Sequence, residues 1–408
     1  MLTSLVGSEM CIRDSSSVNA VHQQFRIVGA GPTGALLALG LAQQGFSVVL
    51  CDRLSADLLV SRSRAYAITH SSRRLLQDLG LWADLKDQME AFRSLRLDDC
   101  STHCTAWFHI RDLRLANRTA EAIGWILDHR PLMSLLLERL EASDLVALQL
   151  DDATPAEEAL ANAGSGHWIV AADGPSSMLR RWAEVPFWSH AYQQGCLTVK
   201  LRLTGADQHC AYELFRPEGP MAVLPLGQDR YQVVWSAPMM RCRDRTASSP
   251  PELLSALNAI LPDGVNAVQL LDEPGAFPLE LSLAPRLHRG SLLLVGEAGH
   301  RCHPVGGQGL NLCWRDVTDL LNLTAAVQRG EMAPPSLPRR YSRRRRMDLV
   351  GVLLSTDLLI RFFSNHNPLL MPFRRLALFL LKRIGWIRRF SLSAMTDGPG
   401  SLLKPLPK

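Results

Sequence analysis

The stretch FRIVGAGPTGALLALGLAQQGFSVVLCD, residues 25–52, decides the fold. It begins with the short apolar run Phe25–Val28, which is typical of a buried strand, and a glycine-rich turn follows at once. Ala35–Gln44 then has the composition of a helix, and Phe46–Leu50 predicts a second strand that ends next to an aspartate. This order of strand, glycine turn, helix, strand and acid indicates a βαβ unit that binds a dinucleotide.

Each residue type in this unit suits a nucleotide. Gly29 permits the tight turn, Gly31 lets backbone amides approach a pyrophosphate, and Gly34 lets the helix pack closely on the strand. The positive end of the helix dipole favours phosphate, and Asp52 can accept both ribose hydroxyls. A glycine-rich turn with a purely structural role is the alternative, and the motif by itself does not separate NAD from FAD.

Two later segments repeat the pattern of a strand followed by a glycine-bearing loop. The run His167–Ala172 leads into Asp173-Gly174, a pair that is also common in ordinary turns. Ser291–Val295 leads into a longer loop over residues 296–311 that has three glycines in four positions, and Leu312–Leu321 then has helical spacing. Such a loop indicates that backbone amides approach an acceptor closely.

Length and composition set the class of protein. The 408 residues fit two to three domains, at roughly 150 residues each, and a hydrophobic content of 47% predicts a large buried core. Apolar runs are shorter than the roughly 18–20 residues of a membrane-spanning helix, and the chain does not start like a signal peptide. Nine scattered cysteines indicate reduced thiols in a cytoplasmic protein. We expect no metal site. Cys100, His103, Cys104 and His109 lack a zinc spacing, and His300, Cys302 and His303 are better explained as part of the glycine-bearing loop.

Residues 1–20 have no helical or strand periodicity. Residues 9–15, EMCIRDS, are also what one reading frame of a common sequencing adapter encodes. We therefore expect residues 1–20 to be a non-native or disordered extension, with a natural extension as the alternative.

Positive charge gathers near the C-terminus. Between Ser336 and Phe390 the chain has thirteen Lys or Arg and two acids, a local net charge of +11 against +5 for the whole chain. Pro372–Phe390, PFRRLALFLLKRIGWIRRF, surrounds six basic residues with Leu, Ile, Phe and Trp, as in helices that lie on an anionic bilayer. A helix pair packed on the core is the alternative. Arg343–Arg346 predicts a solvated helix face, and we expect no nucleic-acid partner because no aromatic residues interleave with the arginines.

Together, the three glycine segments resemble those of the FAD-dependent aromatic hydroxylases with the p-hydroxybenzoate hydroxylase fold. Within these enzymes the chain is most similar to the hydroxylases of ubiquinone biosynthesis (2-polyprenyl-6-methoxyphenol hydroxylases), which act on polyprenylated phenols. Further segments carry this narrower resemblance: Arg64-Ala65-Tyr66-Ala67-Ile68, Gly80-Leu81-Trp82, Ala211-Tyr212-Glu213 with Phe215, Gly219-Pro220-Met221-Ala222-Val223-Leu224-Pro225, Trp235 and Arg315-Asp316-Val317.

The resemblance assigns roles to residues by position. Gly29, Gly31, Gly34 and Asp52 would hold the ADP half of FAD, and Arg64 would lie near the flavin-side phosphates. The other FAD-contacting residues that it implies, from the ribityl chain to the flavin ring, are Arg130, Asp173, Gly174, Gly296, Glu297, Pro304, Gly306, Gly307, Gln308, Gly309, Leu310 and Asn311. The sequence departs from the family pattern where Glu297 replaces a usual aspartate and Cys313 a usual glycine.

The implied activity is that of an FAD-dependent monooxygenase. NAD(P)H would act as a transient reductant, and O2 would supply the oxygen that enters the aromatic ring of a polyprenylated phenol or quinol in the biosynthesis of a ubiquinone-type quinone. His303 and Tyr212 are candidates for a catalytic base, with a packed structural role as the alternative for both. Two other functions stay open: a flavoprotein of the same fold that acts on another phenol or an isoprenoid, and a non-catalytic flavin-binding subunit of a biosynthetic complex.

We therefore expect an α/β fold in which a Rossmann-like FAD-binding domain carries an inserted, mostly antiparallel-sheet substrate domain and a C-terminal helical region. The FAD-binding domain would be discontinuous, over residues 21–182 and 280–335. Residues 183–279 would form the substrate domain and residues 336–408 a basic helical tail. Through residues 372–390 the tail would bring a cytoplasmic protein into peripheral contact with the inner face of a membrane.

Overall fold

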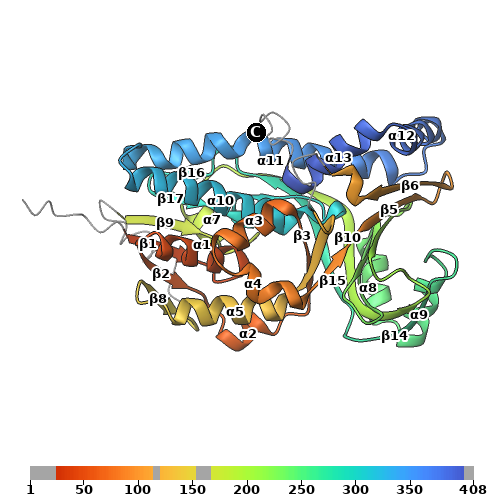
Figure 1. The fold of residues 1–408 in the computed structure, drawn as a ribbon, viewed down its shortest axis with the longest axis horizontal. Coiled ribbons are helices and arrows are strands. Elements are labelled where there is room, and N and C mark those ends of the chain that lie inside the picture. Colours follow the sequence, from red (N-terminus) through yellow and green to blue (C-terminus); the bar gives the residue numbers. More distant parts are fainter. Residues whose placement is uncertain (1–23, 114–119, 153–166, 399–408) are drawn as a thin grey trace, which may run out of the picture.

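The computed structural model describes residues 24–113, 120–152 and 167–398, so the extension expected over residues 1–20 lies outside the described residues. Two lobes lie side by side, and the long C-terminal helices cover one side of both (Figure 1). Within the described ranges, no helix is long and apolar enough to cross a membrane. The eight cysteines of these ranges are free thiols.

The first lobe is built on a six-stranded sheet. Its strand order is β16 (His288–Arg289), β17 (Leu292–Leu294), β9 (His167–Ala171), β1 (Gln24–Val28), β2 (Ser47–Cys51) and β8 (Val146–Gln149). The βαβ unit expected at residues 25–52 is confirmed, because β1 pairs in parallel with β2 on one side and with β9 on the other. The strand order therefore reverses at β1, and the loops that follow such a switch point form a crevice for ligands.

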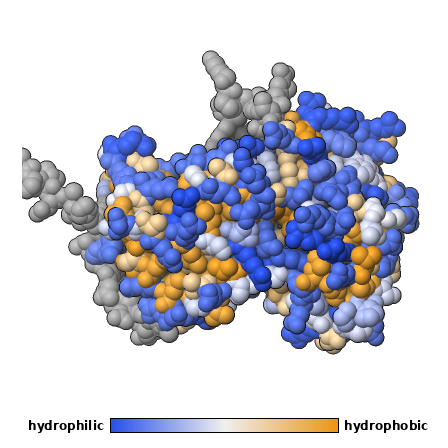
Figure 2. Space-filling model, turned by 60° about the horizontal axis from the view of Figure 1, so that its bottom comes forward, coloured by the Kyte–Doolittle hydropathy of each residue, from blue (hydrophilic) through white to orange (hydrophobic). Residues whose placement is uncertain are grey.

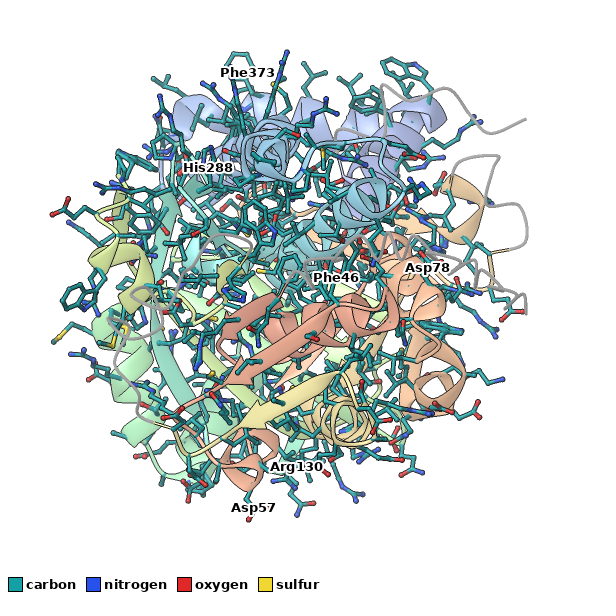
Figure 3. All side chains as sticks on the ribbon, turned by 90° about the vertical axis from the view of Figure 1, so that its left-hand side faces the viewer. Phe46, Asp57, Asp78, Arg130, His288 and Phe373 are labelled. Carbon is teal, nitrogen blue, oxygen red and sulfur yellow. The ribbon has the colours of Figure 1, made fainter. Side chains whose placement is uncertain are left out.

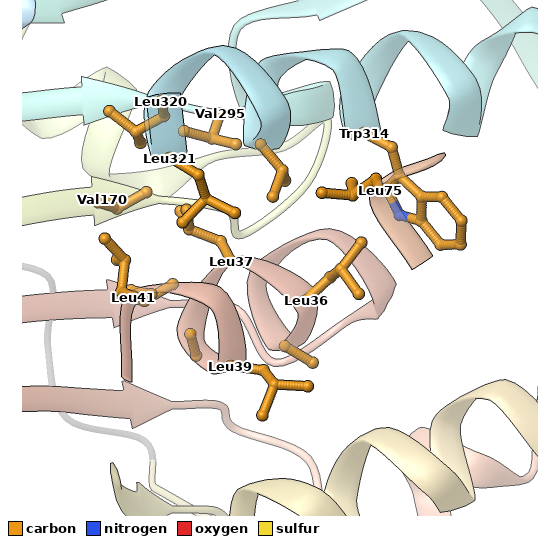
Figure 4. Packing of buried hydrophobic residues seen from close by; sticks show 14 of the residues in the cluster. Leu36, Leu37, Leu39, Leu41, Leu75, Val170, Val295, Trp314, Leu320 and Leu321 are labelled. Carbon is orange, nitrogen blue, oxygen red and sulfur yellow. The ribbon is translucent and has the colours of Figure 1, made fainter. Parts of the chain in front are cut away.

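Helix α1 (Pro32–Gln43) occupies the centre of this lobe. Nine consecutive residues, Gly34–Ala42, are buried, as expected of a helix that is apolar on all sides. It packs against α5 (His129–Glu141) and α10 (Gln308–Gln328), and leucines of α1 face Leu320 and Leu321 of α10 (Figure 4). Gly40 allows this approach, because a Cβ there would lie 2.5 Å from the Leu321 side chain.

The smaller elements of the first half of the chain complete the frame around this sheet. A separate antiparallel sheet has the order β3 (Ala65–Ile68), β7 (Gly124–Asp128) and β4 (Met89–Phe92). Up to residue 182, the other α-helices of the described residues are α2 (Ala56–Val60), α3 (His70–Asp78), α4 (Trp82–Leu85) and α7 (Met178–Trp182).

The second lobe is built on a nine-stranded, mostly antiparallel sheet. Its order is β18 (His300–Arg301), β15 (Gly275–Leu283), β10 (Trp188–Thr204), β13 (Arg230–Pro238), β12 (Met221–Pro225), β11 (Cys210–Phe215), β5 (Ser94–Asp99) and β6 (Cys104–His109), with β14 (Asn266–Leu270) also paired to β10. Helices α8 (Met239–Ala247) and α9 (Pro250–Asn258) follow β13 in the chain.

Strands β5 and β6 join this large sheet although they lie inside the range 21–182 that the sequence assigns to the FAD-binding domain. β5 pairs in parallel with β11, from Ser94 opposite Cys210 to Asp99 opposite Phe215. This pairing places β5 and β6 in the same sheet as the strands of the expected substrate domain. The residue ranges of the domains stay a prediction.

Three helices form the C-terminal region: α11 (Leu337–Phe363), α12 (Met371–Arg383) and α13 (Gly385–Asp397). α11 packs on α10, and α12 packs on β6. The solvated face expected for the arginine run is wrong for Arg345, whose side chain is 2% exposed and pairs with Asp316 at 2.6 Å and Asp348 at 2.9 Å. A buried guanidinium needs such partners, because an unpaired buried charge is strongly destabilising.

Candidate active site

An elongated cavity of about 1230 Å³ lies between the two lobes. Residues from all three glycine segments line it, as do residues of β5, β11 and β12. Pockets for drug-sized ligands measure about 300–1,000 Å³, so this cavity has room for a cofactor and a second molecule. The surface is hollowed between the lobes, with apolar residues on either side (Figure 2).

The turn between β1 and α1 forms one end of the cavity. A Cβ on Gly29 would lie 2.3 Å from the carbonyl oxygen of Ala172, and one on Gly34 would lie 1.9 Å from that of Gly29. Both glycines are thus required by the packing of the chain itself. Gly31 differs, because no described atom lies within 4 Å of its Cβ position. It lines the cavity and precedes α1 without a side-chain cap, which leaves a helix N-terminus that suits an anion.

Asp52 lines the cavity beside this turn. Its Oδ2 accepts a hydrogen bond from the backbone N–H of Ala30 at 2.7 Å, and its Oδ1 accepts one from Leu54 at 2.9 Å. These two bonds fix the carboxylate at the end of β2, and each oxygen keeps a lone pair that can accept a hydroxyl.

Asp173 and Gly174 follow β9 and also line the cavity. Oδ2 of Asp173 accepts a hydrogen bond from the backbone N–H of Met178 at 2.8 Å. Oδ1 is buried and has no hydrogen-bond partner among the described residues. A buried acceptor without a partner, in a residue that lines a cavity, fits a bound molecule that supplies the donor.

The loop over residues 304–311 forms the middle of the cavity wall. Gly306 and Gly307 have φ values of 68° and 62°, a region that favours glycine. A Cβ on Gly307 would also lie 2.9 Å from that of Ala67. The cavity is lined by every residue from Pro304 to Leu310.

Asn311 does not belong to the cavity lining, and it holds the loop in place instead. Its Oδ1 accepts hydrogen bonds from the Ser72 hydroxyl at 2.6 Å and the backbone N–H of Thr69 at 3.1 Å. Its Nδ2 donates to the carbonyl oxygens of Ala67 at 2.7 Å and Gly307 at 2.8 Å. These bonds show that Asn311 positions the loop, and its expected direct contact with the cofactor stays a prediction.

Glu297 lines the cavity, whereas the neighbouring Gly296 lies beneath it. The backbone N–H of Gly296 donates to Asp316 Oδ2 at 2.8 Å, and the same oxygen lies 2.7 Å from His300 Nε2. Burial acts to raise the pKa of Asp316, but the charges of His300 and Arg345 hold that pKa below its ordinary value. An ionised, fully buried aspartate thus anchors the turn that presents Glu297.

The two arginines expected near the cofactor have different positions. Arg64 lines the cavity, and its guanidinium lies over the rings of Tyr66 and Phe277, 5.9 and 5.4 Å from their centroids. Arg130 is an exposed residue near the start of α5, outside the cavity lining, and its expected contact with FAD stays a prediction. It lies at the surface near Asp57, on the side of the molecule opposite Phe373 (Figure 3).

Neither candidate base presents a titrating group to the cavity. His303 is fully buried outside the lining, and burial lowers its pKa to about 3. Its Nδ1 accepts from the backbone N–H of Val305 at 3.2 Å, so the ring is neutral. Tyr212 does reach the lining, but its hydroxyl accepts a hydrogen bond from the backbone N–H of Asp207 at 3.0 Å, in a turn beside the core of the second lobe.

Comparison with known proteins identifies the family. A family model described as FAD binding domain matches residues 23–98 and 139–351, well over half of the chain. The chain belongs to this family. It is 30% identical to the 3-demethoxyubiquinol 3-hydroxylase of Escherichia coli over 386 residues, which cover 90% of this chain and 97% of that protein.

Two further matches agree with this membership. The ubiquinone hydroxylase UbiL of Rhodospirillum rubrum is 30% identical over 89% of this chain and 87% of its own length. The crystal structure of p-nitrophenol 4-monooxygenase PnpA from Pseudomonas putida superposes with a TM-score of 0.75 at 18% identity, over 92% of this chain and 98% of that chain. The structural likeness shows the shared fold.

The family confirms the main expectations from the sequence. The chain is an FAD-dependent monooxygenase with the expected α/β fold, FAD is its cofactor and NAD(P)H is the reductant typical of the family. The cavity fits FAD on structural grounds as well. It offers an uncapped helix N-terminus at Gly31, a fixed carboxylate at Asp52 and the unpartnered Oδ1 of Asp173.

Glu213 is the residue of the site that the sequence analysis misses. It stands in β11 between apolar neighbours, it is 7% exposed, and it lines the cavity. Burial raises its pKa to about 7, and a hydrogen bond from the backbone N–H of Gly306 counteracts only part of this shift. One signal was available: a lone acid within CAYELF is unusual in a strand that is buried along its whole length.

Proposed function

We propose that this FAD-dependent monooxygenase uses NAD(P)H and O2 to hydroxylate the aromatic ring of a polyprenylated phenol or quinol in the biosynthesis of a ubiquinone-type quinone. The names of the relatives at 30% identity support this substrate class, since both are hydroxylases of ubiquinone or its precursors. The lining of the cavity supports the same substrate class.

The cavity continues past loop 304–311 into an apolar chamber between the large sheet and the C-terminal helices. Val305 of the loop belongs to the same buried cluster as Phe215, Phe363 and Leu378. We call apolar chamber the part of the cavity lined by Phe108, Phe215, Phe363, Leu378, Leu381 and Leu392. A chamber of aromatic and aliphatic side chains beside the flavin loop suits a substrate with a polar ring and a long hydrocarbon tail.

The chamber reaches the surface beside α13. Phe390 lines the cavity and is also 54% exposed. Around it, α12 and α13 expose large apolar side chains that we call the apolar patch: Phe373, Leu376, Phe379, Trp386 and Phe390. The exposed cations of the same helices are Arg375, Lys382, Arg383 and Arg389. We infer that this surface lies on an anionic membrane, from which a lipid-tailed substrate can enter the chamber.

The residues of the glycine segments would divide the cofactor among them. Gly31 and the start of α1 suit the pyrophosphate, and Asp52 suits the ribose. Asp173, Gly174, Glu297 and the loop from Pro304 to Leu310 would surround the flavin half. Gly29 lines the cavity beside Gly31, whereas Gly34, Gly296 and Asn311 would shape this surface from behind, since their contacts are with the chain itself.

In the reaction, the acceptance of a hydride from NAD(P)H and the activation of O2 are supplied by FAD when it is bound. The chain would hold FAD and the substrate next to each other in one cavity and would exclude water from the reacting ring of the substrate. Gln308 assists closure, because its Nε2 donates to the carbonyl oxygen of Met395 at 3.1 Å and so ties the flavin loop to α13.

The direct test uses purified protein with the probe 2-geranylphenol. We expect a yellow protein in which this probe stimulates NAD(P)H oxidation and is converted to a product one oxygen heavier by mass spectrometry. The soluble phenol p-nitrophenol serves as the control and should be turned over far more slowly. Turnover of p-nitrophenol but not of the prenylphenol would contradict the proposed substrate class.

The membrane contact has its own test, with Trp386→Ser and Phe373→Ser as paired variants. Sedimentation with phosphatidylglycerol vesicles should be reduced in both variants and lower still with phosphatidylcholine vesicles. Equal binding of wild type and variants to the vesicles would contradict a membrane contact through the apolar patch.

A further inference from the structure

Glu213 lies where the flavin loop meets the apolar chamber. Its carboxyl group interacts with the backbone N–H of Gly306, and Phe215, two residues further along the same face of β11, lines the chamber. The side chain thus stands between the place for the flavin ring and the place for a hydrocarbon tail. A substrate ring held there would carry its hydroxyl within reach of this carboxyl group.

The surroundings of Glu213 hold no compensating charge. Its partners across the sheet are Leu97 of β5 and Ala222 of β12. Two of the three charged residues of β5, Arg96 and Asp98, pair with each other 2.9 Å apart, and the alternation of side chains along the strand places them on the other face. The third, Asp99, shares the face of Leu97, but it ends the strand opposite Phe215 and accepts hydrogen bonds from the Thr102 hydroxyl at 2.7 Å and the backbone N–H of Ser101 at 3.0 Å.

The neighbouring loop and helices do not supply a charge either. Loop 304–311 presents a backbone N–H, His303 behind it is neutral, and α11 to α13 present the apolar side chains of the chamber. Asp357 of α11 is bound to Tyr192, which donates to it at 2.7 Å. No charged side chain contributes to the titration of Glu213 in the described chain.

An unpaired acid in an apolar wall is costly for folding, so its presence requires a function. Building on the proposed function, we propose that Glu213 accepts the proton of the ring hydroxyl of the substrate and holds the resulting phenolate beside the flavin loop. The O–H bond of the phenol breaks, the proton joins the carboxylate to give a neutral acid, and no electrons leave the ring.

This proton transfer prepares the ring for oxygenation. The negative charge left on the phenolate oxygen enters the ring and makes the adjacent carbons better nucleophiles towards an electrophilic oxygen. A base that titrates near the working pH is the most effective. The Glu213 carboxyl group also interacts with the N–H of Gly306, in the loop expected to face the flavin. The group that ionises the substrate is therefore in contact with the loop that positions the cofactor.

A binding measurement on the oxidised holoenzyme tests the proposal without turnover. The probes are 2-geranylphenol and its methyl ether, 2-geranylanisole, and the readout is the change in flavin absorbance. Wild type should bind the phenol roughly tenfold more tightly at pH 8 than at pH 6, since a charge-assisted hydrogen bond forms only with the ionised acid. The ether has no hydroxyl proton and should show no such change.

Variants assign this effect to the residue. Glu213→Gln should keep FAD and lose the pH dependence of phenol binding, whereas Glu213→Asp should retain it. Glu90→Gln is the matched control, because Glu90 lies on β4 outside the cavity lining and its removal should change neither property. Equal affinity of wild type for phenol and ether across this pH range, or an unchanged pH dependence in Glu213→Gln, would overturn the proposal.

Turnover separates this proposal from the proposed function. Hydroxylation by Glu213→Gln should fall by about 100-fold at pH 7 and recover towards pH 10, where the phenol ionises by itself, while reduction of the flavin by NAD(P)H continues. If wild type binds the phenol with the expected pH dependence but forms no hydroxylated product, the proposed function fails and the role of Glu213 as proton acceptor stands.

Discussion

The β1–α1 turn and loop 304–311 are both rich in glycine and both line the cavity, yet they need glycine for different reasons. In the turn, the Cβ positions of Gly29 and Gly34 lie within 2.5 Å of backbone atoms of the same lobe. In the loop, the Cβ position of Gly306 is 3.7 Å from Met395, and that of Gly309 meets no described atom within 4 Å outside its own helix; Gly307 is the exception, at 2.9 Å from the Cβ of Ala67. Gly29 and Gly34 are therefore required by folding, whereas Gly306 and Gly309 leave room beside the cavity that they line.

The largest effect that follows from this difference is on Gly34. Gly34→Ala should lower the free energy of unfolding by about 4 kcal/mol, because the clash is with backbone that cannot move aside. Urea unfolding of the FAD-free protein measures it. Gly31→Ala is the matched variant and should change that free energy by less than about 1 kcal/mol while weakening FAD binding. Equal destabilisation by both variants would contradict the different roles given to Gly34 in folding and to Gly31 in FAD binding.

A second effect concerns the buried acid that the loop contacts. The pKa of Glu213 rises from its ordinary value of 4.5 to about 7 on folding, so the folded state keeps a proton that the unfolded state has lost. The stability that wild type has relative to Glu213→Gln should therefore be full below pH 4.5 and should fall by about 3 kcal/mol as the pH rises through 7. Unfolding midpoints of the two proteins between pH 4.5 and 8 check this. A difference that stays constant over this range would mean that the acid is not buried as described.

The loop should be sensitive where side chains hold it from behind. Asn311→Ala removes five hydrogen bonds and leaves the carbonyl oxygens of Ala67 and Gly307 without that donor. We expect the free energy of unfolding to fall by about 2 kcal/mol, together with weaker FAD binding. Fluorescence titration with FAD and urea unfolding report the two effects separately. An unchanged affinity for FAD would show that the loop does not depend on Asn311.

The smallest effect on stability is expected at Gly309. Gly309→Ala should change the free energy of unfolding by less than about 0.5 kcal/mol, because its Cβ meets open space. The same methyl group projects into the cavity wall, and FAD affinity should fall while stability stays. If Gly309→Ala lowered the free energy of unfolding but left the affinity for FAD unchanged, Gly309 would be needed for folding, as Gly34 is, and not for binding.

Sequence reasoning succeeds where local pattern and local contact coincide. Residues 25–52 contain two strands that pair with each other, β1 and β2, and the glycines that let α1 pack on them. β1, α1 and β2 therefore form within three residues of the expected bounds. β9 and β17, which lead into the other two glycine segments, also form at the expected positions although their sheet partners are distant in the chain, because each is a short apolar run before a glycine-bearing loop.

It fails where the deciding partner is distant in the chain. β5 joins the large sheet because its partner β11 lies more than a hundred residues later. Arg345 is buried because acids on α10 and α11 meet it, although its neighbours in the arginine run are exposed. Arg130 and Asn311 carry suitable chemistry in suitable segments, but both lie outside the cavity lining, and their expected contact with FAD stays a prediction.

The central claim is that three separate glycine segments enclose one FAD along a single cavity. A crystal structure of the yellow holoprotein tests it most directly. We predict one extended FAD, with its pyrophosphate at Gly31 and its flavin ring against the loop from Gly306 to Gly309, beside Glu213. A flavin ring bound elsewhere, with loop 304–311 against solvent, would contradict the account.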